Sequence, residues 1–247
     1  MGAALSSGLL DVPRRPFSGS YTVRDAALLL RATTPPAEVP IPIWAERHTP
    51  LLKASSRAIY AWIREDSGWL APEAVSSRDS VIGFLDLVRL RLYAVLRSRG
   101  VGLADIRRAE DYARQLTGRN DPFVTEPIWT YGSDVFVRWA EMLVSVSRSG
   151  QIAMEELLKS YLQPVFHGLS FNDQEIADVW RPHPGVLVDP EIEFGAPCIE
   201  GTRVQTEAIW AFSQAGDSSE GLALAYRLEI AQIEAAIGWE TRLSEAA

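Results

Sequence analysis

The sequence predicts an α+β protein with a mainly helical N-terminal half, a β-hairpin-rich middle region, and a C-terminal β-hairpin followed by three short helices. Three observations predict this class. Apolar residues recur at helical spacing behind Ser and Thr residues in the first half of the chain. Runs of β-branched and aromatic residues, broken by glycine, follow it. Residues 198–204 then have the composition of a tight hairpin.

The length of 247 residues favours two or three compact units. A change of composition near residue 120 and the prolines at 182 and 184 mark the expected boundaries. The expected parts are a flexible N-terminus (1–20), a helical domain (21–120), a β-rich middle region (121–182) and a three-helix domain (183–247).

Composition restricts the cellular setting. Apolar residues make up 47% of the chain and charged residues 23%, which is ordinary for a soluble globular protein. The single cysteine excludes a disulfide framework and suits a reducing compartment. No apolar run approaches the roughly 20 residues that span a bilayer, and no basic stretch precedes the first apolar residues. We therefore expect a cytoplasmic protein with no signal peptide and no membrane partner.

Helices dominate the first half. Thr22 and Asp25 have the spacing of a capping box before the apolar run over residues 26–30. A proline-rich connection over residues 33–52 interrupts the helices, because proline removes a donor and fixes φ. The further expected elements are a helix that begins at Ser55 or Ser56, a loop or β-wing (67–80), and two helices (84–100 and 101–118).

The middle region is expected to form hairpins. Residues 123–139 and 143–154 are each β-rich and contain a glycine turn. A third hairpin should turn at Asn172 and Asp173, since both residue types favour turns.

The C-terminal region should open with a hairpin centred on Glu200 and Gly201, because glycine adopts positive φ without steric cost. Three helices follow, the first two capped by Thr206 and Ser218. Residues 228–239 of the last helix include glutamates but no Lys or Arg. A surface that faces a protein is therefore more plausible here than one that reads DNA.

The sequence lacks the residue patterns that are typical of enzymes. The three histidines have no paired ligand spacing, and no phosphate-binding or nucleophile motif is present. Cys198, between Pro197 and Ile199, resembles a small core residue more than a nucleophile. The acids Asp173, Glu175 and Asp178 alternate across a predicted hairpin and are expected to be solvated. We expect no catalytic residue, no metal site and no cofactor.

Charge divides the chain into two halves. Residues 1–120 contain 17 Lys and Arg and 12 Asp and Glu, whereas residues 121–247 contain 7 and 20. The first half has a net charge of +5 and the second of −13. This asymmetry favours an anion-binding front half, although solvated surface charge would give the same count.

The order of elements in residues 21–116 resembles a winged helix-turn-helix of the MerR family. The segments "YTVRDAALLL", "SSRAIYAWIRED" and "FLDLVRLRLYAVLRSRGVGLADIRRA" correspond to its first helix, recognition helix and the two helices after the wing. The proline-rich insert departs from the short turn of that motif. The resemblance implies operator DNA as a partner and a homodimer that reads two half-sites. The expected DNA contacts are Ser55, Ser56, Arg57, Tyr60, Arg64 and, at the wing tip, Arg78.

Residues 186–237 resemble the domain-of-unknown-function family 433. Its hallmark, DP…G-x-P-x-x-x-G-T-R before three short helices, occurs as "DPEIEFGAPCIEGTR". Arg227 stands where the family usually has a proline, so the resemblance does not define the turn there. Behind a MerR-like front half, this domain resembles VapB-type antitoxins of type II toxin–antitoxin systems.

The antitoxin resemblance implies a PIN-like ribonuclease toxin as partner and repression of the shared operon. The expected toxin contacts are Phe194, Arg203, Trp210, Arg227 and Trp239. The aromatic side chains among them would equally suit a core, and Arg203 either reaches the toxin or ties the hairpin to its own domain. The alternative function is a stand-alone MerR-like regulator whose C-terminal half senses a ligand, with an effector pocket in residues 121–182. An enzyme is the third possibility.

Overall fold

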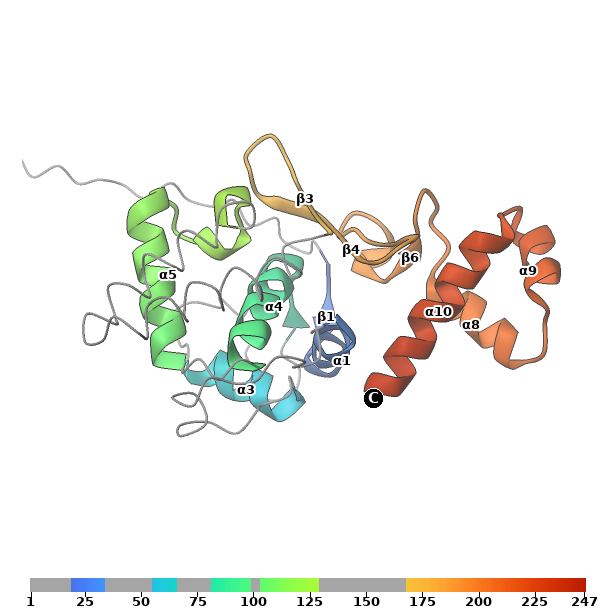
Figure 1. The fold of residues 1–247 in the computed structure, drawn as a ribbon, viewed down its shortest axis with the longest axis horizontal. Coiled ribbons are helices and arrows are strands. Elements are labelled where there is room, and N and C mark those ends of the chain that lie inside the picture. Colours follow the sequence, from blue (N-terminus) through green and yellow to red (C-terminus); the bar gives the residue numbers. More distant parts are fainter. Residues whose placement is uncertain (1–18, 34–54, 66–80, 99–102, 129–167) are drawn as a thin grey trace, which may run out of the picture.

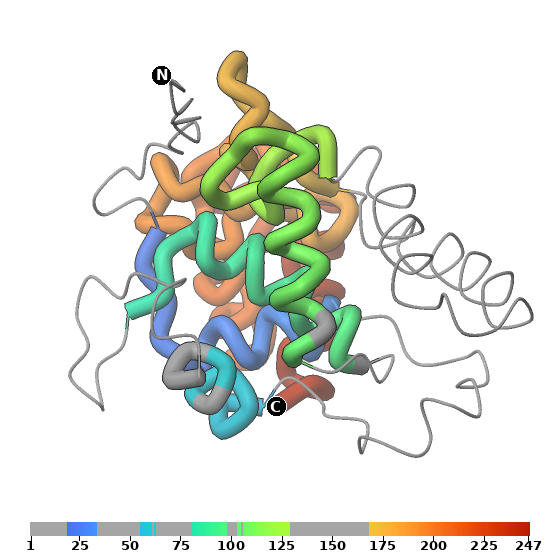
Figure 2. The backbone as a smooth tube through the Cα atoms, turned by 90° about the vertical axis from the view of Figure 1, so that its left-hand side faces the viewer, coloured from blue at the N-terminus to red at the C-terminus, as the bar shows by residue number. Residues whose placement is uncertain are grey.

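The computed structural model describes residues 19–33, 55–65, 81–98, 103–128 and 168–247. The N-terminal helices lie at one end of the molecule, a small antiparallel sheet runs beside them, and the last three helices lie at the other end (Figure 1). The C-terminal end of the last helix returns to the first helix, and the two views agree on this (Figures 1 and 2). The chain is therefore α+β, as expected.

The first helix begins as the sequence predicts. The Thr22 Oγ1 atom accepts a 3.1 Å hydrogen bond from the Asp25 backbone N–H, and Asp25 Oδ2 accepts a 3.2 Å bond from the Thr22 N–H. This reciprocal pair is the expected capping box. The elements of this half are β1 (Tyr21–Thr22), α1 (Val23–Thr33), α3 (Ser56–Glu65), β2 (Val81–Ile82), α4 (Phe84–Ser98) and α5 (Leu103–Thr117).

Helix α3 packs against α1 through its apolar face. Ser55 precedes it, and its Oγ atom accepts a 3.2 Å hydrogen bond from the Ala58 N–H. Ile59 and Trp62 are buried in the core. Strands β1 and β2 pair antiparallel, which joins the start of α1 to the start of α4. The proline-rich connection and the expected wing over residues 67–80 lie outside the described residues.

Helix α4 is the centre of the core. Leu87, Leu90 and Leu92, which point in different directions around the helix, are each at most 1% exposed. The helix is therefore enclosed by α1, α5 and a 3-10 turn, η1 (Pro122–Val124). A buried helix of this kind is expected to be apolar all round, yet α4 also contains the buried arginines Arg89 and Arg91.

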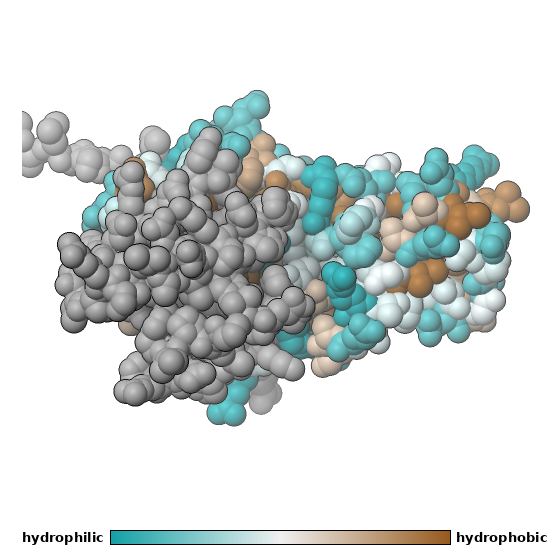
Figure 3. Space-filling model, viewed as in Figure 1, coloured by the Kyte–Doolittle hydropathy of each residue, from teal (hydrophilic) through white to brown (hydrophobic). Residues whose placement is uncertain are grey.

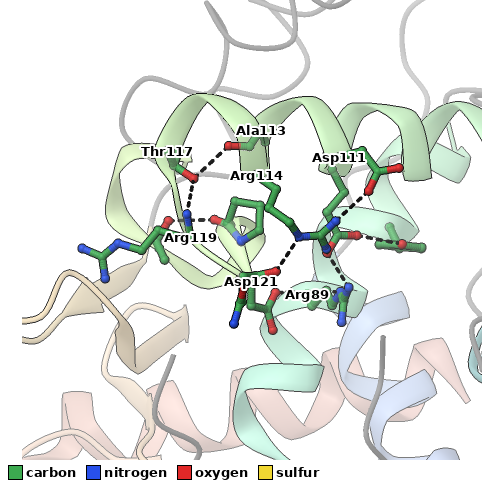
Figure 4. A network of polar contacts seen from close by, with 12 residues as sticks. Arg89, Asp111, Ala113, Arg114, Thr117, Arg119 and Asp121 are labelled. Atoms are coloured by element: carbon green, nitrogen blue, oxygen red, sulfur yellow. Dashed lines mark hydrogen bonds and ion pairs between the residues drawn. The ribbon is translucent and has the colours of Figure 1, made fainter. Parts of the chain in front are cut away.

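A buried polar network holds α4 against α5 (Figure 4). Glu110 is fully buried, is in close contact with the Arg89 guanidinium, and accepts a 3.1 Å hydrogen bond from the Tyr93 hydroxyl. Arg114 approaches Glu110 at 3.7 Å and pairs with Asp111 at 2.6 Å. Burial raises the pKa of Glu110 to about 7, while Arg89 opposes this shift. Nothing in the local sequence pattern predicts this network.

Residues 122–128 do not form the expected hairpin. They adopt η1 and the start of a helix. Pro122 at the first position of η1 fixes a helical φ, and Phe123 and Val124 are fully buried. The rest of the segments expected to form the first two hairpins, residues 129–154, lies outside the described residues.

The third hairpin is confirmed. Strands β3 (Leu169–Phe171) and β4 (Ala177–His183) pair antiparallel, and β5 (Val186–Val188) and β6 (Cys198–Ile199) extend the sheet in chain order. The Asn172 side chain accepts hydrogen bonds from the N–H groups of Gln174 and Ile176, which closes the turn. Pro182 lies inside β4, so the boundary expected at this proline falls within the sheet.

Two contacts join the sheet to the N-terminal helices. The Arg91 guanidinium lies 5.0 Å above the ring of Trp180 in β4, a cation–π distance. Burial lowers the pKa of Arg91 to about 9. Arg119 donates a 3.0 Å hydrogen bond to the Gln174 carbonyl and pairs with Glu175 at 2.7 Å. The sheet therefore packs on the helical half instead of standing apart.

The turn expected at Glu200 and Gly201 forms, but residues 202–204 do not form the expected paired strand, and a single β-bridge joins Cys198 to Gln205. The Thr202 N–H donates a 3.0 Å hydrogen bond to the Ile199 carbonyl, and Gly201 has φ of +80°. The helices that follow are α8 (Thr206–Gln214), α9 (Ser219–Tyr226) and α10 (Ile230–Ala246). Ser218 caps α9 as expected. Thr206 does not cap α8, because it is the first helical residue and its hydroxyl bonds elsewhere.

Arg227 ends α9 in the left-handed conformation, with φ of +55°. The Leu228 N–H donates back to the Ala223 carbonyl at 2.9 Å, which closes the helix end. Proline has φ fixed near −65° and is excluded from this conformation. A proline at position 227 would therefore require a different turn.

Candidate protein-binding cleft

A left-handed turn precedes the C-terminal hairpin. The 3-10 element η2 (Glu193–Gly195) has φ values of +47°, +56° and +85° at its three residues. Glycine tolerates such angles, but for Glu193 and Phe194 each costs about 1–2 kcal/mol. Surrounding contacts must hold this turn, and backbone strain of this kind is often found at functional sites.

Those contacts come from both ends of the chain. The Ser20 N–H donates a 3.0 Å hydrogen bond to the Phe194 carbonyl, and the buried Tyr21 hydroxyl donates a 2.9 Å bond to the Gly195 carbonyl. Burial, and secondarily the nearby Asp189, raise the pKa of Tyr21, so its hydroxyl stays protonated. On the other side, Arg203 pairs with the Glu193 carboxylate at 3.2 Å.

The turn holds Phe194 outward. Its side chain is 76% exposed, although it is attached to a backbone that is fixed on both sides. Exposure of a large aromatic ring in a fixed position is typical of a residue that anchors a protein partner.

Phe194 stands at the edge of a cleft of about 540 Å³ between β1, α1, η2, α8 and α10. Its apolar lining includes Leu28, Leu29, Phe194, Pro197, Trp210 and Leu243. Helix α10 returns to α1 beside these lining residues (Figure 1), and a 2.7 Å hydrogen bond from Arg31 Nε to the Ala246 carbonyl joins the two helices.

Four acidic side chains also line the cleft, namely Asp25, Glu193, Glu207 and Glu240. Glu240 accepts a 2.5 Å hydrogen bond from the Thr206 hydroxyl. Burial raises the pKa of Glu240, and the neighbouring Glu207 carboxylate acts in the same direction. The cleft is thus both apolar and acidic.

The structure brings three of the expected toxin-contact residues together. Phe194 and Trp210 line the cleft, and Arg203 lies beside it through its ion pair with Glu193. Arg203 therefore ties the hairpin to its own domain while its side chain stays 68% exposed. Arg227 is exposed at the end of α9, away from the cleft lining. Trp239 is fully buried beside His183, so it is a core residue and is not proposed as a contact.

Most of the residues expected to contact DNA lie in α3 or directly before it. Ser55, Ser56 and the exposed Arg57 lie together at the N-terminus of α3, although the Ser55 hydroxyl already caps the helix. Tyr60 is half-buried and packs against the core. Arg64 belongs to α3, and Arg78 lies outside the described residues. DNA contact by these residues stays a prediction.

A second apolar surface was not expected from the sequence. Phe212, Leu224 and Ile230 are exposed on the last three helices, where apolar side chains gather at the end of the molecule opposite the N-terminal helices (Figure 3). The centroids of the Phe212 and Tyr226 rings lie 6.4 Å apart. Phe212 does not line the cleft, so the two surfaces are distinct.

Chemistry of the described residues is limited. They contain no cluster of three or more His, Cys, Asp or Glu residues that would hold a metal ion. Burial, followed by the Glu193 carboxylate, raises the pKa of Cys198 to about 11, so the thiol is protonated in the core. Of the three acids in the third hairpin, Glu175 pairs with Arg119. No helix in the described ranges has both the length and the apolar character needed to cross a membrane.

Comparisons with known proteins fit this geometry. Residues 186–239 match the family described as "Protein of unknown function (DUF433)", which confirms the expected resemblance in this region. The chain is 25% identical over 170 residues to the protein named "Putative antitoxin VapB45" from Mycobacterium tuberculosis H37Rv, a match that covers 62% of this chain and 69% of the relative. The crystal structure of Rv2018 from Mycobacterium tuberculosis matches with a TM-score of 0.62 at 20% identity, over 88% of this chain and 96% of that one.

The structural match shows a shared fold along most of the chain. The sequence matches relate the protein to DUF433-containing, antitoxin-like proteins, and the family region includes η2, the hairpin and most of the three-helix unit. The matched region supplies the η2 and α8 side of the cleft, whereas β1, α1 and the C-terminal end of α10, which lie outside residues 186–239, supply the rest of its lining.

Proposed function

We propose that the protein is the antitoxin of a type II toxin–antitoxin system. Its C-terminal half binds and neutralises a toxin, a PIN-like ribonuclease, and its N-terminal half represses the shared operon by binding DNA as a homodimer. The observation that carries this proposal is the exposed Phe194, held on a strained turn at the edge of the cleft within the DUF433 region. The similarity to the protein named "Putative antitoxin VapB45" supports a toxin as the partner, and its class as a PIN-like ribonuclease is part of the proposal.

The charge distribution supports the same assignment of toxin binding and DNA binding to the two halves. The net charge of −13 over residues 121–247 disfavours contact with phosphate and favours a basic partner surface. The net charge of +5 over residues 1–120 favours DNA at the other end. Arg57 at the start of α3 is exposed there, and helix N-termini suit phosphate contacts.

Co-purification tests the proposal. The full chain would be tagged and expressed together with its neighbouring genes from the native locus, and the proteins retained after a salt wash would be identified. We expect a small ribonuclease to be retained at a fixed ratio. We expect Phe194→Ala to lose that protein, because the ring is the exposed anchor of the cleft.

Phe212→Ala is the matched control, since it removes an exposed phenylalanine of the same half outside the cleft. This variant should retain the ribonuclease. Purification of the chain without any neighbouring protein would refute the antitoxin proposal. Equal retention by the two variants would refute the assignment of the cleft.

A further inference from the structure

We propose that the cleft receives a cationic segment of the partner, in which a Lys or Arg side chain lies next to an apolar one. This inference rests on the proposed function only in that the protein has a protein partner. It specifies the chemistry that the cleft recognises, which the comparisons leave open.

The first step is the charge of the lining. Four carboxylates line the cleft, and no Lys, Arg or His is present among the described residues that line it. Two arginines lie beside the cleft, Arg203 paired with Glu193 and Arg31 bonded to the Ala246 carbonyl. Because these two arginines do not balance four acids, positive charge on a partner would complement the lining.

The second step is the position of Glu207. Asp25 is engaged in the capping box of α1, Glu193 in its ion pair with Arg203, and Glu240 in its bond with Thr206. Glu207, in the first turn of α8, is exposed and makes no hydrogen bond or ion pair with the described residues. It is the carboxylate best placed to accept a bond from an incoming side chain.

The third step is the apolar part. Trp210 lies one turn after Glu207 on α8, so both side chains face the same cleft. Phe194 also lines the cleft. An aliphatic stem or aromatic ring of the partner would pack against this apolar lining, while a neighbouring charged group reaches Glu207. Arginine fits both requirements, since its apolar stem packs on rings and its guanidinium pairs with carboxylates.

Other occupants fit less well. Nucleic acid is excluded from this surface, because its phosphates would meet four carboxylates. A second copy of the C-terminal half is disfavoured, because residues 121–247 have a net charge of −13 and would repel each other. A basic segment of a different protein satisfies both the charge and the apolar lining.

The experiment compares two charge reversals with identical net effect. Glu207→Lys changes the first turn of α8 inside the cleft, and Glu220→Lys changes the first turn of α9 outside it. The full chain and both variants would be measured against the partner retained in co-purification, at several salt concentrations. Glu207→Lys should raise the dissociation constant by about tenfold and reduce its salt dependence, whereas Glu220→Lys should leave it nearly unchanged.

A selection that needs no known partner accompanies it. Random twelve-residue peptides would be displayed and selected on the full chain. The proposal predicts enrichment of peptides with Lys or Arg beside an apolar residue, which bind the wild type and Glu220→Lys but not Glu207→Lys. Enrichment of neutral or acidic peptides, or equal binding to both variants, would overturn it. Partner retention with no difference between the variants would overturn this inference while leaving the antitoxin proposal intact.

Discussion

The hydroxyl of Tyr21 donates a 2.9 Å hydrogen bond to the carbonyl oxygen of Gly195, across 174 positions of sequence. This bond joins the first strand of the N-terminal half to the turn that presents Phe194. The proposed DNA-binding half and the proposed toxin-binding half therefore meet at the cleft. The shape of the cleft depends on this contact as well as on the turn itself.

Tyr21→Phe should lower the free energy of unfolding. The variant keeps the buried ring but leaves the Gly195 carbonyl without its donor, which costs about 1–2 kcal/mol of unfolding free energy. Partner binding should weaken as well, since the turn under Phe194 loses one of its restraints. Urea unfolding and the partner's dissociation constant measure the two effects. Unchanged values for both would show that the bond does not hold the turn.

Gly195→Ala should cost more than Gly201→Ala. Both glycines have positive φ, +85° and +80°, so both alanines are strained by about 1–2 kcal/mol. At Gly195 an added Cβ would also collide with the Tyr21 hydroxyl, whereas at Gly201 no atom lies within 4 Å. Thermal unfolding of the two variants compares them directly. A similar loss at both positions would contradict the described packing around Gly195.

The buried pair of Arg89 and Glu110 predicts that two neighbouring substitutions differ in their effect on stability. Glu110→Ala removes the carboxylate in close contact with the buried Arg89 charge, while Asp121 stays 4.0 Å from Arg89, and it should cost up to about 3–5 kcal/mol of unfolding free energy. Asp111→Ala removes an exposed partner of Arg114 and should cost less than about 1 kcal/mol. Chemical denaturation separates these outcomes, and comparable losses would count against a structural role of the network.

The same carboxyl predicts a pH dependence. The pKa of Glu110 is raised to about 7 in the folded state from an ordinary value of 4.5. The folded state thus binds this proton more tightly than the unfolded state does. The contribution of Glu110 to the free energy of unfolding is therefore fully present below pH 4.5 and is lost as the pH rises towards 7. The free energy of unfolding of the wild type, relative to Glu110→Gln, should decrease over this window. A constant or rising difference would show that the folded pKa is not raised.

Operator binding tests the N-terminal assignment. Arg57→Ala and Arg64→Ala should each weaken binding to the promoter of the protein's own operon and reduce its salt dependence, because each removes a charge expected to contact DNA. Electrophoretic mobility shifts at several salt concentrations provide the measurement. If both variants bind as the wild type does, α3 is not the recognition helix.

Local features of the fold were predictable from the sequence. The capping box at Thr22, the turns at Asn172 and Gly201, and the cap at Ser218 each depend on a few neighbouring residues whose types favour one conformation. The expectation that Thr206 caps α8 was wrong, because Pro197 and Glu240, distant in sequence, bond its hydroxyl instead.

The cleft was only partly predictable. Phe194 and Trp210 were expected as contacts from their type, but nothing local distinguishes exposed Phe194 from buried Trp239. Burial depends on which helix packs over each ring, and the left-handed φ of Phe194 depends on Ser20 and Tyr21. The acidic lining joins Asp25 to Glu207 and Glu240, residues that only the return of α10 to α1 brings together.

Growth rescue tests the central claim most directly. The neighbouring ribonuclease gene would be induced in cells that express the wild type, Phe194→Ala or Phe212→Ala at equal levels. The account predicts that the wild type and Phe212→Ala restore growth and that Phe194→Ala does not. Failure of the wild type to restore growth, or equal rescue by Phe194→Ala, would contradict it.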